Sequence, residues 1–119
     1  MVHIHQRKLP SGAKMFRRVK YVHIESFDMD VRVVVTQAEK KKFGIPLEVL
    51  GMAIESEGAF IISLPIKWDE GTVWHEAHHL ARFINKFHGI ITTAEDHEAD
   101  AYLQEYIVRK IKTGIYNRK

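Results

Sequence analysis

Two histidines and a glutamate in the second half of the chain have the types and spacing of a metal site. His75 and His79 are four residues apart, and Glu76 directly follows the first of them. On an α-helix, residues four apart lie on one face, so both imidazoles can bind one ion with the carboxylate beside them. This H-E-x-x-H pattern predicts metal-assisted hydrolysis, with the two histidines on zinc and Glu76 as general base.

The composition narrows the kind of metal site. The 119 residues include 8 histidines and no cysteine, which excludes disulfides and every zinc site built on cysteine. A catalytic zinc site has three protein ligands and an open fourth position, and two histidines with one carboxylate are a known set. The same set binds Fe(II) in oxygenases, but a glutamate directly after the first histidine favours zinc hydrolysis.

The third ligand is expected in the acidic residues 95–100. Glu98 is the favoured candidate because it flanks the apolar row of a second predicted helix, and Asp96, His97 and Asp100 are the alternatives. The apolar row consists of Ala99, Tyr102, Leu103, Tyr106 and Ile107.

The motif itself must lie on a helix that begins after Asp69 or Thr72. Apolar residues recur there at helical spacing, and the three motif residues fall off this stripe, so the helix can be buried while the motif faces a cleft. The stripe consists of Val73, Ala77, Leu80, Ile84 and Phe87.

The end of this helix decides whether Glu98 can reach the histidines. A helix that continued to His88 would overshoot Glu98, since each residue adds about 1.5 Å. An end near Ile84 or Asn85 brings His79 and Glu98 level in an antiparallel pair. We expect the helix to end there, although Gly89 is the stronger stop signal by residue type.

The remaining segments predict a small α+β domain spanning residues 1–119. Strands are expected over residues 2–5, 15–24, 31–35, 47–54 and 59–64, the last two as an antiparallel hairpin. A short helix should begin at Thr36 and stop at Gly44, and the second long helix should run from Thr92 or Thr93 to near Thr113. The strand residues His3, His5 and His23 lack a carboxylate or a fixed spacing and are not expected to be ligands.

Charge is unevenly distributed along the chain. Residues 1–42 carry 10 Lys and Arg against 4 acids, residues 43–105 carry 3 against 11, and residues 106–119 carry 5 against none. The basic ends do not exclude nucleic acid, but the run at residues 40–42 is short and has no interleaved aromatics, which favours solvated surface. No long apolar run and no leader pattern is present, so we expect no membrane span and a cytoplasmic protein.

The segment that starts at Glu98 resembles a known family. Glu98-Ala99-Asp100-Ala101-Tyr102-Leu103-Gln104-Glu105-Tyr106-Ile107 is similar to the E-A-N-x-F-A-x-E-L-L segment of the ImmA/IrrE metallopeptidases, relatives of the gluzincin-type zincins. Small phage-encoded HExxH proteins look similar as well. The resemblance covers residues 58–107. His78 stands where many members have glycine, and we expect no upstream DNA-binding domain like that of some relatives.

The resemblance implies a minimal zincin-like domain that hydrolyses a peptide or protein substrate. It implies that Glu98 is the third zinc ligand, that Glu76 is the base, and that the edge strand of the hairpin lies along the substrate cleft. The alternative is a catalytically idle zincin-fold interaction or assembly protein, for example a component inside a phage particle, with or without the metal.

Two further roles near the metal stay open. His78 points about a quarter-turn from His79 and is expected to support the ligands or lie on the surface. The group that stabilises the oxyanion is Tyr102, His97, His88 or Arg82, and the residues alone do not choose among them.

Overall fold

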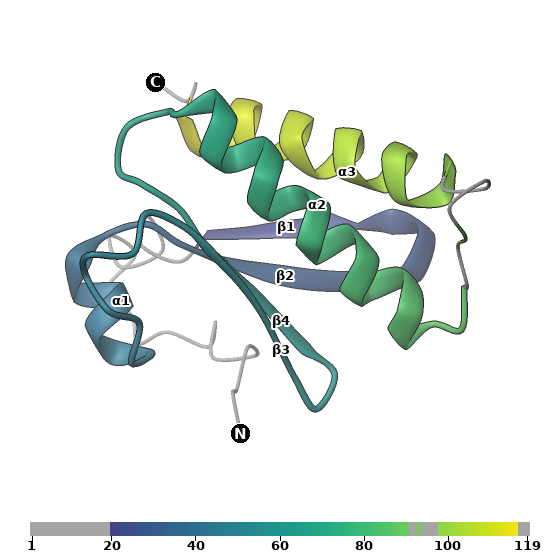
Figure 1. Cartoon of the computed structure of the whole chain (residues 1–119), viewed down its shortest axis with the longest axis horizontal. Coiled ribbons are helices and arrows are strands. Elements are labelled where there is room, and N and C mark those ends of the chain that lie inside the picture. Colours follow the sequence, from purple (N-terminus) through teal and green to yellow (C-terminus); the bar gives the residue numbers. More distant parts are fainter. Residues whose placement is uncertain (1–19, 91–92, 94–97, 117–119) are drawn as a thin grey trace, which may run out of the picture.

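A four-stranded sheet with two long helices on one face forms the described part of the chain (Figure 1). The computed structural model describes residues 20–90, 93 and 98–116. This arrangement confirms the predicted α+β fold class. The elements are β1 (Lys20–Ile24), a 3-10 turn η2 (Glu25–Phe27), β2 (Met29–Val34), α1 (Gln37–Lys42), β3 (Met52–Ser56), β4 (Ala59–Ser63), α2 (Glu70–Phe87), α3 (Glu98–Ile111) and a π-helical segment η3 (Lys112–Tyr116).

The sheet has the strand order β1-β2-β4-β3. β1 pairs antiparallel with β2, β2 pairs parallel with β4, and β4 pairs antiparallel with β3. The predicted hairpin is confirmed: Ser56 pairs with Ala59 across a two-residue turn. Glu57 and Gly58 both have positive φ, at 53° and 86°, as a type I′ turn requires. β3 is therefore the edge strand beside β4.

The core lies between the sheet and the two helices. α3 lies over β1, and α2 lies over the β3–β4 side of the sheet (Figure 1). Alternate strand residues face the helices, as expected for a sheet with one covered face. The fully buried members of this core include Ile24, Val31, Val33, Phe60, Ile62 and Leu64 from the sheet, and Val73, Ala77, Leu80, Ile84, Ile107 and Ile111 from the helices.

The short helix α1 forms as predicted on the other side of the sheet. The hydroxyl of Thr36 accepts a hydrogen bond from the Glu39 amide, and the Glu39 carboxylate accepts from the Thr36 amide, a complete capping box. Gly44 follows the helix with a φ of 72°. Ile45 then packs on Ile61, so α1 anchors the crossover from β2 to the hairpin.

The end of α2 differs from the prediction. The helix continues to Phe87, and Gly89 takes the left-handed position after it with a φ of 80°. The Gly89 amide donates to the Lys86 carbonyl and the Ile90 amide donates to the Asn85 carbonyl, which is the Schellman ending. Asn85 therefore does not stop the helix. Its side chain is needed inside the interface with α3 instead.

Two apolar rows and one strand also depart from expectation. Phe87 is 55% exposed and Tyr102 is 68% exposed, so neither belongs to the core. The predicted strand over residues 47–54 begins only at Met52, because the Val49 amide bonds back to the Pro46 carbonyl in a turn. The α3 row is rotated from the predicted one and buries Asp100, Leu103, Ile107, Val108 and Ile111.

Some predictions fall outside the described residues. These are the strand over residues 2–5, the first part of the strand over 15–24, and a helix start near Thr92. No helix in residues 20–90 and 98–116 combines the length and apolarity needed to cross a membrane.

Candidate metal centre

His75 and His79 come together on α2 as their spacing predicts. Their Nε2 atoms are 3.2 Å apart, and the rings meet nearly perpendicular, at 82°. Two histidine nitrogens on one tetrahedral zinc ion stand about 3.3 Å apart, given zinc–nitrogen bonds near 2.05 Å. The two Nε2 atoms are therefore spaced to bind one zinc ion. The same separation also allows one ring to donate a hydrogen bond to the other.

Glu76 lies beside the pair and faces the hairpin. A Cβ added at Gly51, just before β3, would lie 2.8 Å from Glu76 Cγ and 2.7 Å from Thr72 Cγ2. This close approach places the start of the edge strand directly against the predicted base. An open cavity of about 530 Å³ lies at this point, lined by Leu50, Gly51, Gly71, Thr72, His75 and Glu76. Two of the three motif residues, His75 and Glu76, thus line a cavity.

His78 stands apart from the pair. Its side chain is exposed, and its ring centroid lies 5.5 Å from that of His79. His78 is not among the residues that line the cavity. This placement agrees with a surface position or a supporting one.

The third predicted ligand is not brought to the histidines. Glu98 is the first residue of α3 and is exposed. Within residues 20–90, 93 and 98–116, no three histidine, aspartate or glutamate side chains gather closely enough to hold a metal ion. Glu98 therefore does not form a three-ligand group with His75 and His79 in this structure.

The register of the two helices explains this position. α2 and α3 run antiparallel, and the Asn85 amide donates a 2.7 Å hydrogen bond to the Asp100 carboxyl, which sets Asn85 level with Asp100. Glu98 precedes Asp100 and therefore lies toward the end of α2, past the level of His79. Glu98 also precedes Ile107 by nine residues, so it points about 180° away from this core residue. The longer α2 thus produces the overshoot that a helix reaching His88 implies.

The other candidates for the third ligand divide into two groups. Asp100 is 6% exposed and is bound by Asn85, with Arg82 Nε 3.9 Å from its second oxygen. It is a buried group between the two helices, held by Asn85 rather than directed toward the histidines. Asp96 and His97 lie outside the described residues.

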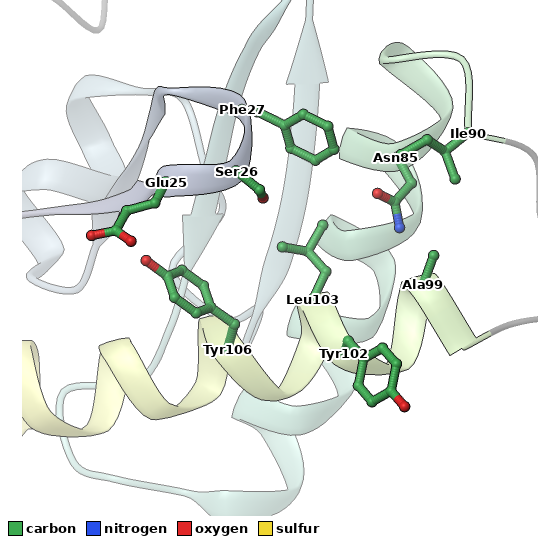
Figure 2. Close-up of a pocket in the computed structure, with 9 residues that line it drawn as sticks. All are labelled: Glu25, Ser26, Phe27, Asn85, Ile90, Ala99, Tyr102, Leu103 and Tyr106. Atoms are coloured by element: carbon green, nitrogen blue, oxygen red, sulfur yellow. The ribbon is translucent and has the colours of Figure 1, made fainter.

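The groups considered for the oxyanion lie elsewhere. Tyr102 lines a separate cavity of about 490 Å³ between η2, α2 and α3, whose lining includes none of the motif residues (Figure 2). His88 stacks on Phe27 and its Nδ1 lies 2.9 Å from the Ile84 carbonyl oxygen. Arg82 is directed to Asp100. His97 lies outside the described residues.

His23 has carboxylate partners that the sequence did not suggest. Its Nδ1 lies 2.8 Å from Asp30 and its Nε2 lies 3.5 Å from Asp28 across the β1–β2 turn. The strand pairing, which sets His23 opposite Asp30, brings them together. This exposed trio is not among groups suited to a metal within the described residues. His3 and His5 lie outside them.

Several residues that line the cavity beside Glu76 were not predicted from the sequence. Leu50 and Gly51 precede β3, and Thr72 lies one turn before Glu76 on the same face of α2. The helical spacing of Thr72 and Glu76 was a usable signal. The approach of Gly51 was not, because it depends on how the hairpin meets α2.

Comparisons with protein-family models, with curated proteins and with solved structures found no match.

Proposed function

We propose that this protein is a zinc-dependent peptidase. The observation that carries the proposal is the pair of Nε2 atoms of His75 and His79, 3.2 Å apart, with Glu76 beside an open cavity. The histidines are the two imidazole ligands, and Glu76 is the general base. A bound zinc ion would supply Lewis acidity, which acidifies water and polarises the carbonyl of an amide.

The surroundings of Glu76 support a polypeptide substrate. Among the described residues β3 pairs only with β4, so its outer edge presents backbone donors and acceptors to an added strand. The start of this strand touches Glu76 through Gly51. An extended chain paired with β3 would bring its amide groups past the carboxylate, which then takes the proton from the attacking water.

Substitution of Glu76 by glutamine tests the reaction. We expect Glu76→Gln to bind zinc at the wild-type stoichiometry and to lower peptide cleavage by about 100-fold or more, since a general base contributes at least this much. Zinc content is measured by elemental analysis, and cleavage by mass spectrometry of a random peptide mixture. His78→Ala is the matched control, because His78 neighbours the pair without lining the cavity.

Three outcomes separate the alternatives. Loss of cleavage with zinc retained supports the proposal. Wild-type protein that binds zinc and cleaves nothing in the mixture points instead to a catalytically idle interaction or assembly protein. Wild-type protein that binds no zinc contradicts the metal site itself.

The third ligand needs its own series. Alanine variants at Asp96, His97 and Glu98 are compared for zinc affinity by competition with a chelator. Substitution of the true third ligand should lower the zinc affinity far more than substitution of either of the other two residues. The exposed, outward position of Glu98 leads us to expect that Glu98→Ala has the smaller effect if the helix pair keeps the register seen here.

A further inference from the structure

A row of side chains on α2 continues from the predicted base toward the end of the helix. Thr72, Glu76, His79, Phe83 and Phe87 follow one another at steps of three or four residues, so they share one face. Phe83 is 36% exposed and Phe87 is 55% exposed. The ring of Phe83 also stacks beside that of His79, with centroids 6.5 Å apart. Two exposed aromatic rings therefore adjoin the predicted metal site.

The hairpin runs alongside this row. Gly51, before β3, meets Thr72 and Glu76, while Gly58, after β3, lies where a Cβ would be 3.2 Å from Phe87 Cζ. The two contacts fix the direction: β3 advances along α2 from the level of Glu76 to that of Phe87. An extended chain paired with the outer edge of β3 would thus pass both the base and the aromatic rings.

Acidic side chains lie at both ends of the row. At the Thr72 end, Asp69 and Glu70 are exposed, and the Thr72 hydroxyl donates a 2.7 Å hydrogen bond to the Asp69 carboxylate. At the Phe87 end, Glu55 and Glu57 of the hairpin are exposed. The two ends differ in the exposed phenylalanines, so a segment that complements the row carries a large apolar side chain on that side of the reacting amide.

We infer that the aromatic pair, Phe83 and Phe87, selects the substrate: an extended polypeptide segment with a large apolar side chain on one side of the cleaved bond. This inference rests on the proposed peptidase function and names its substrate class. Phe83 acts by contact with the substrate side chain, and Phe87 is held in place by an edge contact with Phe60, 5.6 Å between centroids. An apolar contact of this kind discriminates by about 10-fold to 100-fold.

The test maps cleavage preferences in a synthetic ten-residue peptide library with the zinc-loaded protein. We expect aromatic and large aliphatic residues to be enriched within three positions on one side of the cut. Phe83→Ser should lower the apolar enrichment about 10-fold while zinc affinity stays at the wild-type level. Phe83→Leu should restore most of the preference.

Tyr102→Ser is the matched control, because Tyr102 is an exposed aromatic residue on the neighbouring helix that lines the other cavity (Figure 2). It should leave the preference unchanged. Cleavage without apolar enrichment, or with enrichment that Phe83→Ser leaves intact, overturns the inference while the peptidase function stands.

A second measurement keeps the two proposals distinguishable. Binding of fluorescent peptides to the Glu76→Gln variant is compared for a Lys- and Phe-containing peptide and its Phe-to-Ser version. If nothing is cleaved but the Phe peptide binds about 10-fold more tightly, and Phe83→Ser removes the difference, the aromatic pair is supported and turnover is not. Equal binding of the two peptides overturns the inference.

Discussion

The two flanks of α2 are built differently. On the flank toward α3, side chains form hydrogen bonds between the helices: the 3% exposed Asn85 binds Asp100, and Gln104 donates to the Trp74 carbonyl. On the flank toward β3, Glu76 lines an open cavity, and the hairpin approaches the helix closely at Gly51 and Gly58. One helix thus has a flank that fixes the fold and a flank that is available for a ligand.

This difference separates local from non-local information. The positions of His75 and His79 follow from helix geometry within one turn, so spacing alone predicts them. The position of Glu98 depends on the register between two helices, which one buried hydrogen bond sets. The two histidines proposed as ligands, which share one helix, are therefore easier to foresee from the sequence than the predicted third ligand on another helix.

The largest expected effect is on zinc affinity, when either histidine of the pair on the flank of α2 toward β3 is replaced. His75→Ala and His79→Ala should each lower zinc affinity by more than about 100-fold, because loss of a ligand costs more than loss of a residue that supports one. His23→Ala serves as the control, since His23 lies on β1 away from the pair. Isothermal titration with zinc measures the affinities. Equal effects of all three variants would contradict the assignment of the pair.

The next effect concerns the α3-side flank and stability. Asn85→Ala removes a buried hydrogen bond to a carboxyl group and should lower the free energy of unfolding by about 2 kcal/mol. Gln104→Ala removes an exposed hydrogen bond between the same two helices and should cost less than about 1 kcal/mol. Urea denaturation measures both. If Asn85→Ala also abolished zinc binding in the folded protein, the separation of the two flanks would fail.

The accuracy of the sequence-based predictions follows the same division between local and non-local contacts. The helix start at Thr36, the hairpin turn and the His75–His79 pair arise from neighbours a few residues apart, and all three form as predicted. The predicted end of α2 was wrong because it was chosen to bring Glu98 level with His79, whereas the helix ends at Gly89, the stronger stop signal by residue type. An assumed tertiary contact thus replaced a correct local signal.

The candidate site shows the same limit. No sequence pattern reports that Gly51 packs on Glu76, because the two come together only when the hairpin docks on α2. The exposure of Tyr102 likewise depends on the rotation of α3, which one heptad of apolar residues does not settle.

A glycine on the β3-side flank gives a smaller and more specific effect. Gly51→Ala places a methyl group within 3 Å of both Thr72 and Glu76, so the base must shift. We expect cleavage to fall about 10-fold with zinc affinity unchanged, since small displacements of a catalytic group cost this much or more. Gly71→Ala is the control, because a Cβ there meets nothing within 4 Å. Steady-state kinetics and zinc titration measure the two effects. Equal activities of the two variants would show that the approach of β3 does not position Glu76.

The smallest effect lies again on the α3 side, where Tyr116 ties η3 to the loop before α2. Its hydroxyl donates to the Pro65 carbonyl, and burial, followed by the nearby Asp69 carboxylate, raises its pKa from the ordinary 10.0 to about 12. Because the folded protein favours the neutral hydroxyl, this contribution is complete below pH 10 and is lost as the pH rises toward 12.

Tyr116→Phe should therefore cost about 1 kcal/mol at neutral pH and should flatten the decline in stability between pH 10 and 12. Tyr106→Phe, which removes an exposed hydroxyl bond to the His23 carbonyl, is the matched control. Urea denaturation across this pH range measures both variants, with zinc affinity at neutral pH as the second readout. Tyr116 lies on the structural flank, so zinc affinity should not change. If the stability of Tyr116→Phe had the same pH profile as that of the wild type, another group would control stability above pH 10.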